Sequence, residues 1–202
     1  MLTLFHSPQT RSTRVVALLA AMDALDWVEV REVSVRRYDG SGARDAANPH
    51  PEGKVPLLVH DGVAIRETAA ILLYLTDMFP ASGLGVPVGD PLRGRYLSWL
   101  AWYAGVMEPA LILDAARLEH PSLLATFRDV SAIRARLAEA LAEGPWLVGG
   151  RYTAADLICA SPFLWFRDLD PGSDAVRDWV ARCSAHPGLV AARVRDERAR
   201  AA

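Results

Sequence analysis

The loop His6–Ser12 carries polar side chains directly before a stretch with helical spacing of apolar residues. A helix N-terminus presents unpaired N–H groups and the positive end of the helix dipole, so Gln9, Thr10, Arg11 and Ser12 stand where a thiolate or a phosphate would bind. A structural reading is also open, in which Thr10 or Ser12 simply caps the helix. The segment by itself favours the cap.

A second candidate is Gly53-Lys54-Val55-Pro56, at the entry to an expected strand. If the Val55-Pro56 bond is cis, the Val55 N–H and C=O face outward, toward the backbone of a ligand. An isolated X–Pro bond is cis only about 5% of the time, so the dipeptide alone does not decide this. Lys54, the only lysine of the chain, adds an ammonium group suited to a carboxylate.

A third candidate is Arg66-Glu67-Thr68, which begins another helical pattern. Thr68 suits a helix cap and Glu67 suits the positive helix end. A carboxylate beside unpaired N–H groups also suits a zwitterionic amino-acid group. Taken alone, this segment too favours the cap.

The segment Gly150–Leu157 has a structural rather than a chemical role. Thr153 and Asp156 have the spacing of a capping box, with Asp in place of the usual Glu or Gln, and should nucleate a helix. The five histidines show no ligand spacing with each other or with the two cysteines, so we expect no metal. Cys159 and Cys183 lie on helical patterns and are expected to be packed. The sequence contains no phosphate-binding loop and no nucleophile elbow.

Composition narrows the classes of protein further. The chain has 202 residues, 51% of them apolar, and a formal net charge of −2. It is long and apolar enough for a sizeable core, and its balanced charge argues against nucleic-acid binding. The longest uncharged apolar run, 97–107, is shorter than the roughly 20 residues that span a bilayer, and no secretory signal is visible. We therefore expect no nucleic-acid or membrane partner and a cytoplasmic location.

The first 79 residues alternate between strand and helix patterns. We expect a strand at 2–5, a helix from residue 11 to 22, a strand at 27–35, a hairpin around Asp61-Gly62 and a helix at 67–79. The polar segment 36–51 between them is irregular, with one short helix expected near 43–47. The order is β-α-β, a connection, then β-β-α.

Residues 80–91 are rich in proline and glycine and are expected to be a linker. From residue 92 to 202 the pattern is helical throughout. We expect one long helix at 92–118, kinked at Pro109, then helices at 122–143, from 153, at 173–185 and after 188. The chain thus divides into domains 1–79 and 92–202.

Together these segments resemble the cytosolic glutathione transferase superfamily. The resemblance rests on SPQTRSTRV, HPEGKVPLLV, the Asp-Gly hairpin, RETAAILLYL and GGRYTAADL, in this order over essentially the whole chain. It implies an α/β thioredoxin-like N-terminal domain, an all-α C-terminal helical domain and a homodimer. Glutathione is then the co-substrate, and a small hydrophobic electrophile is the second substrate.

The resemblance also assigns residues. The Val55 backbone would pair with the cysteinyl part of glutathione, Glu67 and Thr68 with its γ-glutamyl group, and Lys54 and His50 with its glycyl carboxylate. Trp99, Trp102, Tyr103 and Met107 would face the apolar co-substrate, although Trp99 and Trp102 equally suit a core between the domains. The predicted glutathione-binding set is Gln9, His50, Lys54, Val55, Pro56, Glu67 and Thr68, and the predicted co-substrate pocket is Trp99, Tyr103 and Met107.

The sequence departs from the family where the thiol is activated. Gln9 stands where some classes have a catalytic Ser or Thr, Arg11 stands where another has Cys, and Phe5 and His6 replace a Tyr. We expect Thr10, Arg11, Ser12 or backbone N–H groups to activate the thiol. Two functions stay open: a transferase, or a reductase of disulfides or peroxides, that uses the glutathione thiolate, and a non-catalytic carrier or partner-binding protein.

Overall fold

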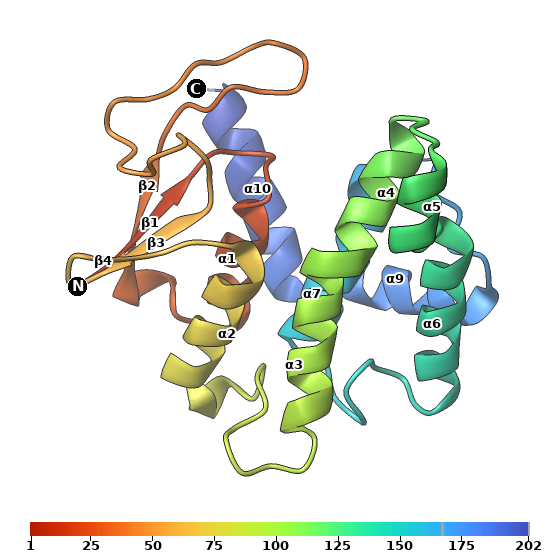
Figure 1. Cartoon of the computed structure of the whole chain (residues 1–202). Helices are drawn as coiled ribbons and strands as arrows, with labels where there is room; N and C mark the ends of the chain where they lie inside the picture. The colour runs from red at the N-terminus through yellow and green to blue at the C-terminus, as the bar shows by residue number, and fades with distance from the viewer. Residues whose placement is uncertain (167, 202) are drawn as a thin grey trace. The chain divides into compact units, whose positions relative to one another are not determined.

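The computed structural model describes residues 1–166 and 168–201. These form two compact units, one made of Met1–Ser82 with His186–Ala202 and the other of Gly83–Ala185 (Figure 1). The domain boundaries expected at residues 79 and 92 stay a prediction. At the C-terminus, however, the grouping of residues into compact units differs from the expected domains. The last helix belongs to the first unit by its contacts and not to the helical unit.

The first unit is built on a four-stranded mixed sheet in the order β2-β1-β3-β4. β1 runs parallel to β2 and antiparallel to β3, which pairs with β4 as a hairpin. Asp61 and Gly62 both have positive φ at the hairpin turn, which confirms the turn expected from this dipeptide. The strands are β1 (Leu2–His6), β2 (Val28–Glu32), β3 (Leu57–His60) and β4 (Val63–Ile65).

Two of the helices in this unit begin beside the predicted binding segments. α1 (Thr13–Ala21) follows the loop after β1, and α2 (Thr68–Met78) follows the hairpin. The short 3₁₀ turns η1 (Leu25–Trp27) and η2 (Pro80–Ser82) complete the unit with α10 (Pro187–Ala201). The apolar face of α1, which includes Val15, Val16, Leu18 and Leu19, is fully buried.

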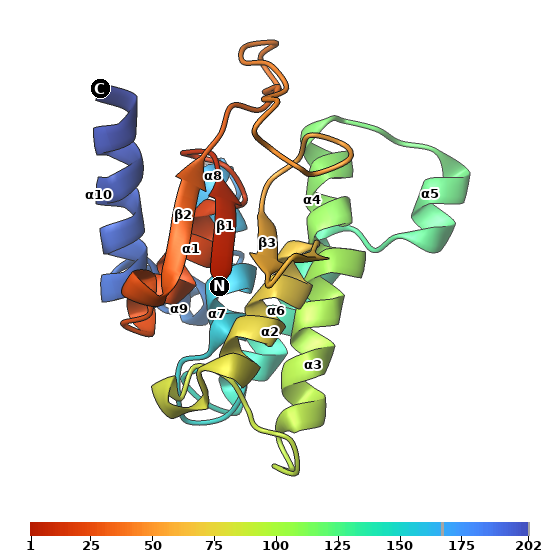
Figure 2. The same cartoon turned by 90° about the vertical axis from the view of Figure 1, so that its left-hand side faces the viewer.

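Between β2 and β3 the chain forms a long loop that extends beyond the sheet (Figure 2). The short helix expected near 43–47 is absent from this described segment. The Asp45 carboxylate instead accepts hydrogen bonds from the N–H groups of Ala47, at 2.8 Å, and Ser34, at 3.1 Å. These side-chain bonds compete with helical hydrogen bonds and stabilise a turn.

α10 packs along α1, and a glycine makes the close approach of the two helices possible. A Cβ on Gly188 would lie 2.5 Å from the Ala17 carbonyl oxygen and 2.6 Å from the Ala21 Cβ. Gly188, Leu189, Ala192 and Asp196 form the buried face of α10. The helical pattern predicts this element but not its packing partner, which explains the difference in grouping.

The second unit consists of helices. The helix expected at 92–118 is interrupted by η3 (Tyr103–Met107), a π-helical turn. Pro109 follows this turn directly, in the first turn of the next helix, and the kink expected at Pro109 stays a prediction. The helices are α3 (Arg93–Trp102), α4 (Glu108–Ala115), α5 (Pro121–Thr126), α6 (Val130–Ala142), α7 (Ala154–Ala160), α8 (Pro162–Trp165) and α9 (Asp174–Ser184).

Side-chain caps decide two of the helix starts in this unit. The helix expected at 122–143 is split because Asp129 accepts a hydrogen bond from the Ala132 N–H at 2.8 Å and starts α6. The predicted capping box of Thr153 and Asp156 is confirmed at the start of α7. Asp156 also accepts bonds from the Trp179 indole N–H and the Leu147 N–H, so it ties α7 to α9 and to the preceding turn.

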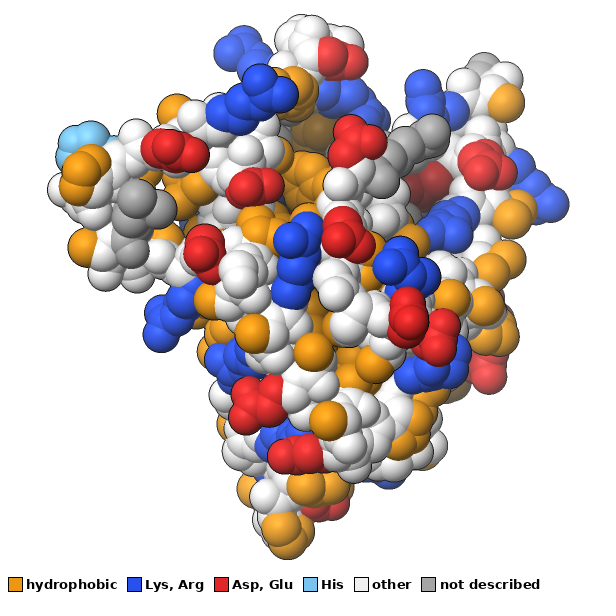
Figure 3. All heavy atoms as spheres, turned by 90° about the vertical axis from the view of Figure 1, so that its right-hand side faces the viewer, with side chains coloured by type: hydrophobic (Ala, Val, Ile, Leu, Met, Phe, Trp, Pro, Cys, Tyr) orange, Lys and Arg blue, Asp and Glu red, His pale blue; other side chains and the backbone are white. Residues whose placement is uncertain are grey.

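No helix within residues 1–166 and 168–201 has the length and apolar character needed to cross a membrane. The face of the molecule drawn in Figure 3 shows acidic and basic side chains interspersed with apolar ones.

Candidate functional site

The loop after β1 folds back on itself before α1. Gln9 has a φ of 55° and turns the chain, and the Thr10 hydroxyl donates to the Ser7 carbonyl at 2.7 Å. Arg37, from the long loop after β2, donates to the Pro8 carbonyl at 2.9 Å. These contacts hold Thr10 and Arg11 at the N-terminus of α1, where the helix dipole favours an anion.

A cavity of about 370 Å³ opens beside this loop. It brings together five residues that the sequence analysis proposed: Gln9, Thr10 and Arg11 from the first loop, and Lys54 and Val55 from the approach to β3. The remaining lining residues are Val35, Arg36, Arg37, Tyr38 and Asp39. Basic side chains therefore predominate, which suits a ligand with carboxylate groups and a thiolate.

The Val55-Pro56 peptide bond is cis, as the resemblance implies. Pro56 is buried and Val55 is half-buried at the cavity. The Asn48 side-chain amide donates to the Lys54 carbonyl at 3.0 Å and so fixes the chain directly before the dipeptide.

The other predicted glutathione-binding side chains lie outside this lining. His50 is buried, and its Nδ1 accepts a hydrogen bond from the Glu52 N–H at 3.0 Å. Glu67 is exposed at the N-terminus of α2, with Thr68 half-buried beside it. Glu67 has a φ of 68°, an uncommon conformation for a residue with a side chain, and such outliers concentrate at functional sites.

The capping interpretation fits Thr10 but not Ser12 at the start of α1. The Thr10 hydroxyl accepts a hydrogen bond from the Ser12 N–H at 3.2 Å, whereas Ser12 makes no side-chain capping bond. At α2 the N-cap position is Glu67 rather than Thr68, and Glu67 makes no side-chain capping bond.

Ser12, one of the predicted thiol-activating residues, is turned into the protein. Its side chain is 0% exposed, and its hydroxyl lies 2.8 Å from His6 Nδ1 and 2.7 Å from the Thr10 hydroxyl. It also accepts from the Ser7 N–H at 3.1 Å. Direct contact between Ser12 and a ligand is therefore not supported, which leaves Thr10 and Arg11 at the cavity.

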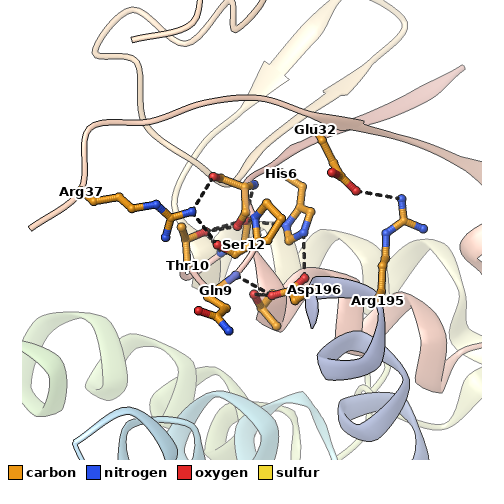
Figure 4. A network of polar contacts seen from close by, with 11 residues as sticks. His6, Gln9, Thr10, Ser12, Glu32, Arg37, Arg195 and Asp196 are labelled. Carbon is orange, nitrogen blue, oxygen red and sulfur yellow. Dashed lines mark hydrogen bonds and ion pairs between the residues drawn. The ribbon is translucent and has the colours of Figure 1, made fainter. Parts of the chain in front are cut away.

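Sequence reasoning missed Asp196, which connects α10 to this loop (Figure 4). Its carboxylate accepts from the Gln9 N–H at 2.6 Å and from the Thr13 hydroxyl, and lies 3.0 Å from His6 Nε2. Burial acts to raise the pKa of Asp196, but the hydrogen bonds from His6, Thr13 and Gln9 outweigh it and hold the pKa below the usual 3.8. A signal was available: Asp196 follows Gly188 and Ala192 at four-residue spacing, an acid on the apolar face of a helix.

The predicted co-substrate residues lie in the packed interior of the helical unit. Trp99, Tyr103 and Met107 are 4%, 1% and 0% exposed, and Trp102 is equally buried. Trp99 and Trp102 pack edge to face, with the Arg136 guanidinium over both rings. This arrangement favours the core interpretation for both tryptophans over a lining role.

Among the residues that the structure describes, no group of three or more His, Cys, Asp or Glu side chains could hold a metal ion.

Comparison with known proteins gives matches over most of the chain. Residues 4–83 match the N-terminal domain of glutathione S-transferases, and residues 102–187 match their C-terminal domain. Glutathione S-transferase GstA of Escherichia coli is 30% identical over 57% of this chain and 59% of its own length, so the chain spans about three fifths of that relative. The disulfide-bond oxidoreductase YfcG of Escherichia coli is 27% identical over 98% of this chain and 99% of that protein.

A similar solved structure is that of a sphingomonad glutathione S-transferase complexed with glutathione. It superposes with a TM-score of 0.77 at 28% identity, over 96% of this chain and 98% of that one.

Proposed function

Because the chain belongs to the glutathione transferase family, we propose that it binds glutathione as the thiolate and uses it as a nucleophile. The observation that carries this proposal is the cavity that joins the N-terminus of α1 to Lys54 and Val55. Thr10 and Arg11 border one part of it and Lys54 another, so that a thiolate and a carboxylate of one ligand each have a partner.

Glutathione is proposed to lie along the Val55 backbone, its glycyl carboxylate near Lys54 and its sulfur near the start of α1. Glu67 and Thr68, at the N-terminus of α2, are proposed to hold the γ-glutamyl group. The exposed Glu67 carboxylate suits the ammonium and the helix N–H groups suit the carboxylate of this zwitterion. His50 is proposed to act without contact with the ligand, by stabilising the turn that it forms with Glu52.

Thiol activation needs only a modest free energy. A thiol of pKa about 8.5 must be lowered by roughly two units to be mostly thiolate at neutral pH, which takes about 2.7 kcal/mol. A helix N-terminus contributes about 0.3–1 kcal/mol, and one hydrogen bond to a charged group about 1.5–3 kcal/mol. The Thr10 hydroxyl is the proposed donor of that bond, with the Arg11 guanidinium adding positive charge.

The thiolate is proposed to attack an electrophilic carbon of a small apolar molecule. Reduction of disulfides or peroxides is a second candidate, favoured by the disulfide-bond oxidoreductase that matches along its whole length. In that reaction the glutathione sulfur attacks a disulfide sulfur and releases the other sulfur as a thiolate. We propose that the protein works in the cytoplasm, where glutathione keeps thiols reduced. We also propose that it forms a homodimer, which sedimentation would detect.

The experiment measures glutathione binding by calorimetry and turnover with chlorodinitrobenzene and with a small disulfide. Glu67→Ala should weaken binding about tenfold or more with little change in folding, because it removes one exposed charged partner. Glu197→Ala, an exposed acid on α10, is the matched control. An unchanged dissociation constant in Glu67→Ala contradicts the assigned pose, and binding without turnover of either substrate class supports a carrier.

A further inference from the structure

The proposed function leaves one buried polar chain unexplained. It runs from Asp196 on α10 through His6 and Ser12 to Thr10, which borders the cavity (Figure 4). Asp196 is 2% exposed, and His6 and Ser12 are 0% exposed. Only the last member, Thr10, meets the space in which the glutathione sulfur is proposed to lie.

The contacts along this chain fix the position of the Thr10 hydroxyl. Thr10 Oγ1 lies 2.7 Å from the Ser7 carbonyl and 2.7 Å from Ser12 Oγ. Ser12 Oγ lies 2.8 Å from His6 Nδ1 and 3.2 Å from the Ser7 carbonyl. His6 Nε2 lies 3.0 Å from Asp196 Oδ1, and because a carboxylate only accepts, the Nε2–H donates to it.

With its Nε2–H donating to Asp196, the His6 ring is held in one orientation, and its Nδ1 meets the Ser12 hydroxyl. Ser12 Oγ in turn lies within hydrogen-bond distance of Thr10 Oγ1. The carboxylate and the ring therefore position Ser12, and Ser12 positions Thr10.

This arrangement has a consequence at the cavity. The Thr10 oxygen is held by its contacts with Ser12 Oγ and with the Ser12 N–H. The Thr10 hydrogen can turn from the Ser7 carbonyl to a sulfur in the cavity while the oxygen stays in place.

Three other charged groups of this region, Glu32, Arg37 and Arg200, have partners outside this chain of contacts. Glu32, opposite His6 in the β1–β2 register, lies 3.8 Å from the Arg195 guanidinium. Arg37 donates to the Pro8 carbonyl and to the Ser7 hydroxyl. Arg200 donates to the Gln9 side chain. Asp196 is the charged group in hydrogen-bond contact with the His6 ring.

We propose that Asp196 and His6 are positioning residues that act through Ser12 to make the Thr10 hydroxyl a donor to the glutathione sulfur. This inference rests on the proposed function, because it takes the sulfur to lie near Thr10. It assigns the C-terminal helix a part in thiol activation, without contact between that helix and the ligand.

The test measures the pKa of the bound glutathione thiol from the ultraviolet absorbance of the thiolate across neutral pH. Asp196→Asn removes the charge at nearly constant volume. The thiol pKa should rise by about one unit, a tenfold loss of thiolate on the acid side. The kcat should fall about tenfold there and recover at higher pH. The Kd of S-methylglutathione, which has no thiol to ionise, should change less than about threefold.

His6→Gln separates positioning from anchoring. The Gln amide can still donate to Asp196 at the place of Nε2, but it loses the contact with Ser12. We expect the same rise in thiol pKa as in Asp196→Asn, and no larger rise in the double variant, because both changes interrupt one chain. Glu197→Gln, the neighbouring exposed acid on α10, is the matched control and should leave the thiol pKa unchanged.

Thr10→Val keeps the test decisive if a buried variant fails to fold. It removes only the hydroxyl of a half-buried residue and should also raise the thiol pKa. An unchanged thiol pKa in Thr10→Val, or in folded Asp196→Asn, overturns this inference while glutathione binding and turnover stand. If the unaltered protein does not bind glutathione at all, the proposed function and this inference fall together.

Discussion

Asp156 and Asp196 are both buried carboxylates, and their pKa values are shifted in opposite directions. Burial raises the pKa of Asp156, and the hydrogen bonds from Leu147, Trp179 and Thr153 offset this only in part. At Asp196 the hydrogen bonds from His6, Thr13 and Gln9 prevail, with the charge of His6 adding to them. The balance between burial and hydrogen bonds therefore sets the direction of the pKa shift at each carboxylate.

The pKa shift of Asp196 predicts a pH dependence of folding. A carboxylate with a lowered folded-state pKa stabilises the protein fully above its unfolded pKa, near 3.8, and this stability is lost as the pH falls through the folded-state value. The free energy of unfolding should therefore differ most between the unaltered protein and Asp196→Asn at neutral pH, and the difference should shrink in acid. Urea unfolding at neutral and acid pH measures it. A gap that stays constant would contradict the assigned shift.

The candidate site was predictable from the sequence only in part. Thr10, Arg11, Lys54 and Val55, which line the cavity, were proposed because short motifs at a helix start and a strand entry can be recognised locally. Asp196 was not found: its place on the apolar face of α10 signals a buried acid, but its partner Gln9 lies 187 positions away and the spacing does not identify that partner. The burial of Ser12 was not predicted, since the motif does not tell which hydroxyl turns inward.

At the level of elements, the contact between α1 and α10 depends on the absence of one side chain. Both helices were expected from their apolar spacing, whereas their proximity follows from Gly188. The breaks at η3 and before α6 were likewise not predicted from the spacing, although η3 lies directly before Pro109, where an irregularity of the helix was expected.

Gly188→Ala should destabilise the first unit. The added methyl group meets backbone atoms of Ala17 and Ala21 at 2.5 and 2.8 Å, so one of the two helices must shift. Overpacking of this kind costs about 1–3 kcal/mol. Chemical denaturation measures the change.

Gly94→Ala, in α3, is the control for this prediction. Nothing lies within 4 Å of the added Cβ there, and the φ is compatible with a side chain. Stability should stay constant or rise by up to about 1 kcal/mol, because alanine favours helix. Equal effects of the two substitutions would contradict a steric origin.

On the scale of the whole molecule, the residues that line the cavity all belong to one of the two compact units. A ligand that binds only the folded state stabilises that state by mass action, about 2.7 kcal/mol at a concentration of 100 Kd. S-methylglutathione should therefore raise the Tm of the first unit by several degrees in calorimetry. At the same concentration Glu67→Ala should show a smaller rise, and an equal rise would contradict the role of Glu67.

The sequence by itself determined the order of strands and helices, the α/β and helical halves of the chain, the family, and the polar segments beside the first helix. These follow from local spacing, turn residues and motifs, which act between near neighbours along the chain. The tertiary structure alone decided that the last helix joins the first unit, that Trp99 and Met107 are buried, and that Asp196 meets His6. Such contacts depend on close packing and hydrogen-bond geometry between segments that are distant in the sequence. Local sequence patterns predict neither of these.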